Sequence, residues 1–116
     1  GIMLSHILYR NIDPDWPASL SEKIGVDMLR KQMGFEGLVL TDDLDMKAIK
    51  LDIRTCISRI LKCGTDQTLI CSRNANQENA LDEILRLCRN DRRMSENREK
   101  SVKRIIMKKS SAKTLT

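Results

Sequence analysis

Three aspartates stand directly after a short apolar run, in the segment GLVLTDDLDM that covers residues 37–46. Carboxylates this close together repel one another, so a folded protein keeps them for a helix cap, a metal ion or a reaction. Asp42 or Asp43 is compatible with the cap of a helix beginning near Leu44. A Mg²⁺ or Ca²⁺ site completed by Asp45 is a second interpretation, although the glycine and the distant glutamate of a calcium loop are missing. The third interpretation is a catalytic carboxylate.

Polar residues also follow the neighbouring strands that the sequence predicts. In parallel α/β folds, reactive groups gather at the carboxyl ends of the strands. Asp42 stands at this position, His6 follows the strand before it, and Ser72 and Arg73 follow the strand after it. We therefore expect these residues on one rim of a parallel sheet.

The elements that must position this rim alternate between strand and helix. Short apolar runs predict strands at residues 2–4, 35–41 and 68–71, and helical spacing of apolar residues predicts helices at 20–33, 53–63, 80–88 and from 95 onward. Strands that alternate with helices indicate right-handed βαβ units and an α/β fold with a parallel sheet. Three strands do not close a barrel, so the chain is either a small α/β layer or part of a larger barrel.

Local signals mark the ends of these helices. Ser19, with Glu22 three residues later, fits a capping box before the first helix. Gly34 and Gly64 end the first two helices. The polar segment 110–116 is expected to be a disordered tail after a folded unit of residues 1–109.

Composition argues against several classes of protein. No apolar run approaches the ~18 residues of a membrane span, and no signal peptide is recognisable, so we expect a soluble, cytoplasmic protein. The chain has one histidine and no C-x-x-C pair, so neither a metal site nor a cofactor is predicted. Its four cysteines are expected to be buried free thiols: Cys56, Cys63, Cys71 and Cys88.

The motifs resemble those of glycoside hydrolase family 3, and in particular the bacterial β-N-acetylhexosaminidases of cell-wall recycling. TDDLDMKAI at residues 41–49, preceded by LRKQMGFEGLVL at 29–40, is similar to the block around the family's nucleophile. MLSHI at 3–7 with DPDWPASLS at 13–21 resembles the strand and loop before that block. CGTDQTLIC at 63–71 is similar to the next strand, and SVKRII at 101–106 to a closing helix.

This resemblance implies a fold, a reaction and a site. The family's domain is a (β/α)8 barrel, and residues 1–109 match only its last three strands. Asp42 takes the position of the nucleophile of a retaining glycosidase. His6 is a candidate substrate contact, with a core or rim position as the alternative. The intact barrel would hydrolyse terminal β-linked N-acetylglucosamine in muropeptides or chitooligosaccharides without metal or cofactor.

Two motifs of the family have no counterpart in this chain. They are the K-H-F-P-G-H-G sequence that holds the sugar and the Asp–His pair that serves as acid and base. Losing the acid/base alone typically costs ~10² to 10⁴ in rate, so we expect little or no hydrolase activity from the isolated chain.

Two non-enzymatic interpretations remain open. Residues 92–116 carry nine Lys/Arg against two Glu, which would allow binding to nucleic acid through phosphates, although interleaved aromatics and a recognisable motif are missing. The exposed edges of a three-stranded sheet would instead let the chain pair with itself or with a complementing part of the barrel.

Overall fold

The computed structural model describes residues 1–72 and 75–114, so Arg73, one of the expected rim residues, lies outside the described residues. The elements follow one another in this order: β1 (Ile2–Leu4), the 3₁₀ turn η1 (Ala18–Leu20), the π-helix η2 (Lys23–Gln32), β2 (Val39–Asp43), α1 (Ile53–Cys63), β3 (Gln67–Leu69), α2 (Ala75–Asn90) and α3 (Arg92–Thr114). This alternation confirms the predicted α/β class.

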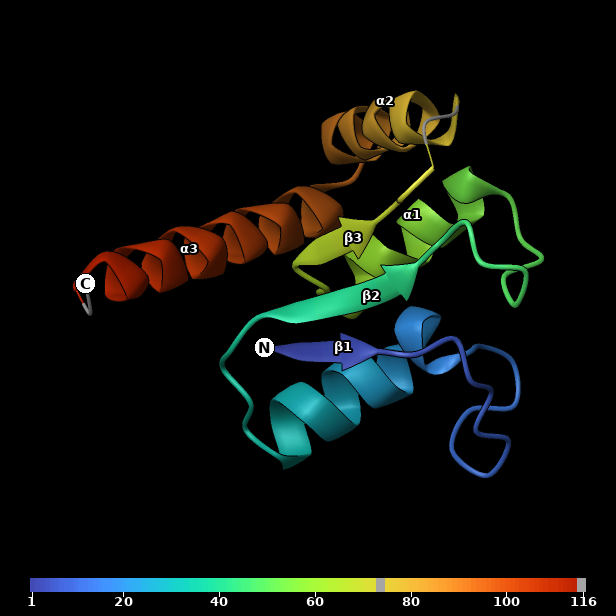
Figure 1. The fold of residues 1–116 in the computed structure, drawn as a ribbon, viewed down its shortest axis with the longest axis horizontal. Coiled ribbons are helices and arrows are strands. Elements are labelled where there is room, and N and C mark those ends of the chain that lie inside the picture. Colours follow the sequence, from blue (N-terminus) through green and yellow to red (C-terminus); the bar gives the residue numbers. More distant parts are fainter. Residues whose placement is uncertain (73–74, 115–116) are drawn as a thin grey trace.

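The strands form one parallel sheet in the order β1-β2-β3, with β2 in the centre (Figure 1). Met3 of β1 lies opposite Leu40 of β2, and Leu40 lies opposite Gln67 of β3. The carboxyl ends of all three strands therefore meet at the same edge, as βαβ connections require. The parallel arrangement that the sequence predicts is confirmed.

The two faces of the sheet differ in what covers them. Val39 is buried and packs with Leu29 of η2 on the helix-covered face. Side chains alternate along a strand, so Leu40 points to the other face, together with its neighbours Met3 and Gln67. Met3 is 54% exposed there. We call this side, which bears Met3, Leu40 and Gln67, the open face. Gln67 also lies on the open face. This position explains why β3 contains a polar residue that would be unfavourable on a buried face.

The ends of α1 have recognisable causes. Asp52 caps its start, because its carboxylate accepts a hydrogen bond from the backbone N–H of Thr55 over 2.9 Å. Gly64 ends it with φ of 64°, and Gly34 follows η2 with φ of 65°, so both predicted glycine stops are confirmed. The chain between β2 and α1 makes turns and no helix. The interpretation of Asp42 or Asp43 as the cap of a helix beginning near Leu44 is therefore wrong.

The predicted capping box at Ser19 is also wrong. Ser21 takes that role, because its Oγ accepts a hydrogen bond from the N–H of Ile24 over 3.2 Å. The same hydroxyl donates to the carboxylate of Asp13 over 2.6 Å. Ser19 lies one 3₁₀ turn earlier, fully buried. The sequence places two serines two residues apart, and the 3₁₀ turn of η1 decides which of them begins the helix.

An aliphatic core lies between α1 and the two helices that follow it. Its buried members are Leu20, Leu44, Cys56, Ile57, Ile60, Leu61, Ala80 and Met94. Burial raises the pKa of the Cys56 thiol to about 11 and that of Cys63 to about 12. Cys71 is exposed, so the expectation of a buried thiol is wrong there.

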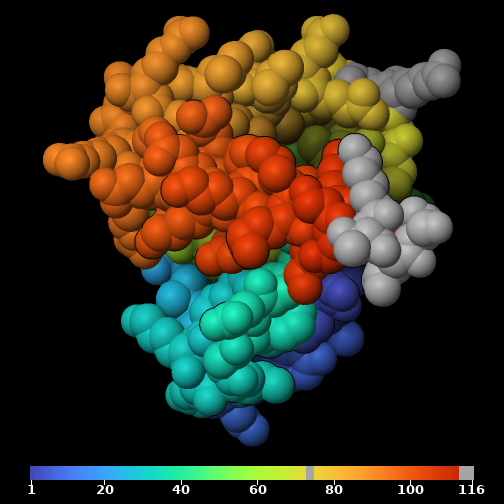
Figure 2. Space-filling view, turned by 90° about the vertical axis from the view of Figure 1, so that its left-hand side faces the viewer, coloured from blue at the N-terminus to red at the C-terminus, as the bar shows by residue number. Residues whose placement is uncertain are grey.

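Helix α3 lies across one side of the molecule, between α2 and the segment that joins η2 to β2 (Figure 2). It continues to Thr114, whereas the sequence predicts a disordered tail from Ser110. Ser111 Oγ donates to the carbonyl of Met107 over 3.1 Å within this last part of the helix. In the described part of the chain, no helix combines the length and the apolarity needed to cross a membrane.

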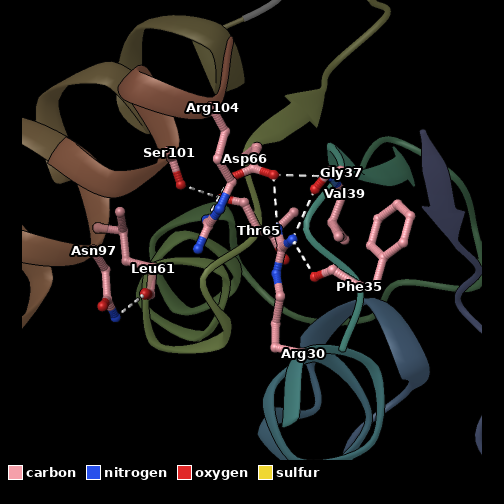
Figure 3. A network of polar contacts seen from close by, with 10 residues as sticks. All are labelled: Arg30, Phe35, Gly37, Val39, Leu61, Thr65, Asp66, Asn97, Ser101 and Arg104. Carbon is pink, nitrogen blue, oxygen red and sulfur yellow. Dashed lines mark hydrogen bonds and ion pairs between the residues drawn. The ribbon is translucent and has the colours of Figure 1, made fainter. Parts of the chain in front are cut away.

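A buried carboxylate, Asp66, connects three elements (Figure 3). Its Oδ2 accepts hydrogen bonds from Arg30 of η2 over 2.8 Å and from the N–H of Val39 over 2.9 Å. Its Oδ1 accepts one from Arg104 of α3 over 2.9 Å. Because the Asp66 side chain is fully buried, these donors replace the water that the charge has lost.

Candidate active site at the carboxyl edge of the sheet

Asp42 and Asp43 are the last two residues of β2 and stand at the carboxyl edge of the sheet. Alternation places the Asp42 side chain on the open face, two residues after Leu40 and opposite in direction to the buried Thr41. Its Oδ1 accepts a hydrogen bond from the N–H of Asp43 over 2.8 Å. Within residues 1–72 and 75–112 no further donor reaches this carboxylate, so its other oxygen can receive an incoming group.

Asp43 has a structural role, in which its side chain and backbone connect the ends of all three strands. Its carboxylate Oδ1 accepts from the N–H of Cys71, just beyond β3, and from the N–H of Asp45, both over 3.1 Å. Its backbone carbonyl accepts from His6 Nε2, just beyond β1, over 2.8 Å. One residue of β2 thus connects the carboxyl edge on both sides, through its side chain and its backbone.

His6 uses both ring nitrogens inside the chain. A carbonyl oxygen only accepts, so Nε2 must carry the hydrogen that bonds to Asp43. In the neutral ring, Nδ1 then accepts from the hydroxyl of Ser19 over 2.7 Å. The ring therefore braces β1 against β2 and against the buried η1 turn. A contact between His6 and a sugar would have to replace one of these two hydrogen bonds.

The turn after β2 is tied to the loop after β3. Asp45 accepts from the N–H of Ser72 and from the side-chain amide of Asn76, both over 3.0 Å. The expected gathering of His6, the aspartates and Ser72 on one rim is therefore confirmed. Among residues 1–72 and 75–112, no group of three His, Cys, Asp or Glu side chains has the arrangement of a metal site.

Asp13 fixes the loop after β1, a role that was not predicted from the sequence. Asp13 is buried, and its carboxylate accepts from the N–H groups of Asp15 and Trp16 and from the hydroxyl of Ser21. Burial opposes the charge, but these hydrogen bonds, with that from Ser21 the strongest, hold the pKa of Asp13 below its ordinary value. An aspartate that bonds to the backbone two residues on is typical of an Asx turn, so Asp13-Pro-Asp was an available signal.

Several bacterial β-hexosaminidases are similar in sequence to this chain. A β-hexosaminidase from Nitrosomonas eutropha is 38% identical over 87 residues, which are 73% of this chain and 24% of that protein. A β-hexosaminidase from Actinobacillus succinogenes is 35% identical over 112 residues, which are 95% of this chain and 32% of that protein. The chain therefore spans between about a quarter and a third of the length of these curated relatives.

Solved structures show the same fold. The β-N-acetylglucosaminidase from Thermotoga maritima superimposes with a TM-score of 0.83 at 29% identity, over 90% of this chain and 24% of that one. The β-N-acetylhexosaminidase from Beutenbergia cavernae superimposes with a TM-score of 0.84 at 26% identity, over 93% of this chain and 32% of that one. The sequence profile of the glycosyl hydrolase family 3 N-terminal domain matches residues 1–107, and the chain belongs to that family.

Proposed function

We propose that this chain supplies the nucleophile edge of a retaining β-N-acetylhexosaminidase, with Asp42 as the nucleophile. The observation that carries the proposal is that the neighbouring carboxylates differ in their hydrogen-bond donors. Asp43 and Asp45 accept hydrogen bonds from the loops around them, whereas Asp42 on the open face accepts one from its own neighbour. A nucleophile needs an oriented carboxylate with an oxygen left for the sugar.

The proposed reaction follows the two-step scheme of retaining glycosidases. A carboxylate oxygen of Asp42 attacks the anomeric carbon of a terminal β-linked N-acetylglucosamine, and the bond to the leaving oxygen breaks as an acid protonates it. Water then releases the sugar from the covalent intermediate. The hydrogen bond from the N–H of Asp43 orients the attacking carboxylate. Muropeptides or chitooligosaccharides are the substrate class, and the scheme uses neither metal nor cofactor.

The isolated chain lacks the partner that this scheme requires. Its only histidine, His6, is engaged by Ser19 and Asp43, and the family's Asp–His and sugar-holding motifs do not occur in the sequence. We infer that the chain alone has little or no hydrolase activity, because both the acid and most of the sugar's positioning contacts are missing.

We further infer that the sheet is the last part of a (β/α)8 barrel. Two observations support this. The outer edges of β1 and β3 have no further strand in the described residues, and the open face exposes Met3 to solvent. A complementing part of the barrel would pair with these edges, and self-association of the chain is the alternative. The buried free thiols Cys56 and Cys63 favour a reducing compartment such as the cytoplasm.

A complementation assay tests the proposal. The chain is mixed with the remaining part of the β-hexosaminidase from Actinobacillus succinogenes, and release of a fluorogenic leaving group from a β-N-acetylglucosaminide is measured. We expect activity only in the mixture, lost by more than about a thousandfold with Asp42→Asn. Asp15→Asn is the control, because it removes the same charge from an exposed side chain in the loop after β1 and should retain most of the activity. Activity that survives Asp42→Asn, or an assembled mixture that is inactive, would contradict the proposal.

The basic helix α3 offers the rival function of binding nucleic acid. Three of its arginines already form ion pairs, Arg92 with Glu96, Arg93 with Glu22 and Arg104 with Asp66. We therefore propose that the remaining charges form a solvated face. Strong, salt-sensitive retention on heparin that disappears when residues 92–116 are removed would favour the rival instead.

A further inference from the structure

A groove of about 630 Å³ lies along α1, between α2 and the loop that follows β1. This volume is within the range of ~300–1,000 Å³ that is usual for small-molecule sites. The groove is separate from the candidate active site, because none of the residues at the carboxyl edge of the sheet lines it. Its wall is strongly basic, with one carboxylate, Glu83, and four cationic side chains, Arg54, Arg59, Lys62 and Arg86.

At one end of the groove, the buried carboxylate of Glu83 orients two arginines. Its Oε2 accepts hydrogen bonds from Arg54 over 2.8 Å and from Nε of Arg86 over 3.1 Å, and its Oε1 accepts from the same Arg86 guanidinium. The Glu83 side chain is 4% exposed, whereas those of Arg54 and Arg86 are 49% and 58% exposed. A guanidinium carries five N–H donors, so most donors of these two arginines stay available on the solvent side.

Near the other end, Arg59 is held in place by three contacts. Its guanidinium stacks on the indole of Trp16, with 4.2 Å from Cζ to the ring centroid, and its Nε donates to the carbonyl of Leu20 over 3.1 Å. Glu22 lies 3.8 Å from Arg59, but its other carboxylate oxygen lies 3.0 Å from Arg93, outside the groove. Cations therefore outnumber carboxylates here even when Glu22 is counted.

Lys62 and Ser58 supply donors that the protein does not use. Among the side chains of residues 1–72 and 75–112, neither has an ion-pair or hydrogen-bond partner. Both lie on the same face of α1 as Arg54, at intervals of four residues. Arg54 and Lys62 are thus about 12 Å apart along the helix axis. Thr55, whose hydroxyl donates to Asp52, completes the wall between them.

We propose that this groove binds a small molecule that carries at least two phosphate groups. One phosphate pairs with Arg54 and Arg86, and a second pairs with Arg59 and Lys62. The part of the ligand between them lies along Ser58. Guanidinium donors match phosphate oxygens in geometry as well as in charge, and here they are oriented before the ligand arrives. A single phosphate would reach one pair of cations and leave the other pair uncompensated.

Inorganic tripolyphosphate is the probe, and inorganic monophosphate at the same ionic strength is the comparison. Both are titrated into the 116-residue chain in magnesium-free buffer. Calorimetry measures Kd, and amide chemical shifts locate the site. We expect saturable binding of tripolyphosphate, with shifts confined to α1, α2 and the loop that contains Trp16. Monophosphate should bind at least about tenfold more weakly, because it cannot engage both pairs of cations at once.

Three variants separate the groove from general attraction to a basic protein. Lys62→Gln removes the unpaired cation and should weaken tripolyphosphate binding about three- to fivefold. Ser58→Glu places a carboxylate between the two pairs of cations and should weaken binding more than tenfold. Lys100→Gln removes the same charge from an exposed position on α3 and is the matched control, with Kd unchanged. Equal Kd values for Lys62→Gln and Lys100→Gln would overturn the proposal, as would an absence of saturable binding or shifts confined to α3.

A hexaglutamate peptide distinguishes a small phosphorylated ligand from an acidic segment of a partner protein. Each carboxylate carries one charge, so the peptide should displace tripolyphosphate only at concentrations well above those of the probe. Tighter binding of hexaglutamate than of tripolyphosphate would overturn the proposal in favour of a protein partner. No step of this test involves hydrolysis, so its outcome is independent of the role of Asp42.

Discussion

The Nε2 of His6 lies 2.8 Å from the backbone carbonyl oxygen of Asp43, so the end of β1 is bonded to the residue that follows Asp42. This single imidazole also reaches the buried hydroxyl of Ser19 through its other nitrogen. The only histidine of the chain therefore connects two strand ends and a turn.

We expect His6→Ala to lower the free energy of unfolding by about 1–3 kcal/mol, because it removes two hydrogen bonds and leaves a half-buried carbonyl unsatisfied. Ser19→Ala removes one of the two bonds and should cost less, about 1 kcal/mol. The double variant should cost less than the sum, because the two side chains share a bond. Urea unfolding measures all three, and strictly additive losses would show that the pair does not interact.

Asp66 is the buried acid whose removal should cost most. Asp66→Asn leaves Arg30 and Arg104 facing each other without the negative charge between them. We expect a loss of about 3–5 kcal/mol, as is typical when one member of a buried ion pair is removed. Asp27→Asn is the matched control, since its pair with Lys31 is exposed and should be worth less than about 0.5 kcal/mol. Equal losses for the two variants, measured by thermal unfolding, would contradict this assignment.

Glu83 should make the stability of the chain depend on acid pH. The hydrogen bonds of its carboxylate to Arg86 and Arg54 lower the pKa of Glu83 from 4.5 to about 2, against the opposing effect of burial. A lowered pKa in the folded state stabilises the fold above the unfolded value, and this contribution disappears as the pH falls from 4.5 towards 2.

Urea unfolding at pH 7, 4.5 and 3 would detect this contribution. Glu83→Gln should be less stable than the parent at pH 7, and the gap should be smaller at pH 3, because the unfolded parent binds a proton below pH 4.5 whereas folded Glu83 stays ionised down to about pH 2. Glu78→Gln, on the same helix and in its exposed first turn, is the control and should follow the parent at every pH. A constant gap between Glu83→Gln and the parent would show that the charge of Glu83 is not responsible.

Thr65→Val should stabilise the chain. Among the residues that the structure describes, the hydroxyl of Thr65 is buried without a hydrogen-bond partner, and valine replaces it with a methyl group of similar size. We expect a gain of about 1 kcal/mol. Thr55→Val is the contrasting variant, because the hydroxyl of Thr55 donates to Asp52 over 2.7 Å at the start of α1 and its loss should destabilise. Differential scanning calorimetry would show midpoints that move in opposite directions, and a lower midpoint for Thr65→Val would be evidence of a partner for its hydroxyl.

Local sequence signals predicted the elements well where the cause was local. Gly34 and Gly64 adopt the positive φ expected of glycines that end helices, and apolar spacing located α1. Ser19 shows where such signals fail. Its sequence context fits a cap, but the long-range contact with His6 and the turn of η1 give that role to Ser21.

The candidate site was predictable in part for the same reason. An apolar run that ends in Asp42 marks the end of a strand, and strand order brings His6 and Ser72 to the same edge. No local pattern distinguishes Asp42 from Asp43, however, because the difference lies in bonds to residues 28 and 37 positions away. Asp66 and Thr65 were not recognised as structural residues, since their surroundings come from η2, β2 and α3.

Different selective pressures should act on the two neighbouring carboxylates at the end of β2, one on structure and one on the proposed reaction. Asp43 holds the three strand ends together, so its loss would disturb the shape of every loop on that edge. Asp42 is bonded only to the N–H beside it among the described residues, so its loss would leave that shape intact. In a lineage that has lost the proposed reaction, Asp42 can therefore be substituted while Asp43 is retained. In a set of related sequences, an unpaired change at Asp42 would mark the members that have kept the architecture and given up the reaction.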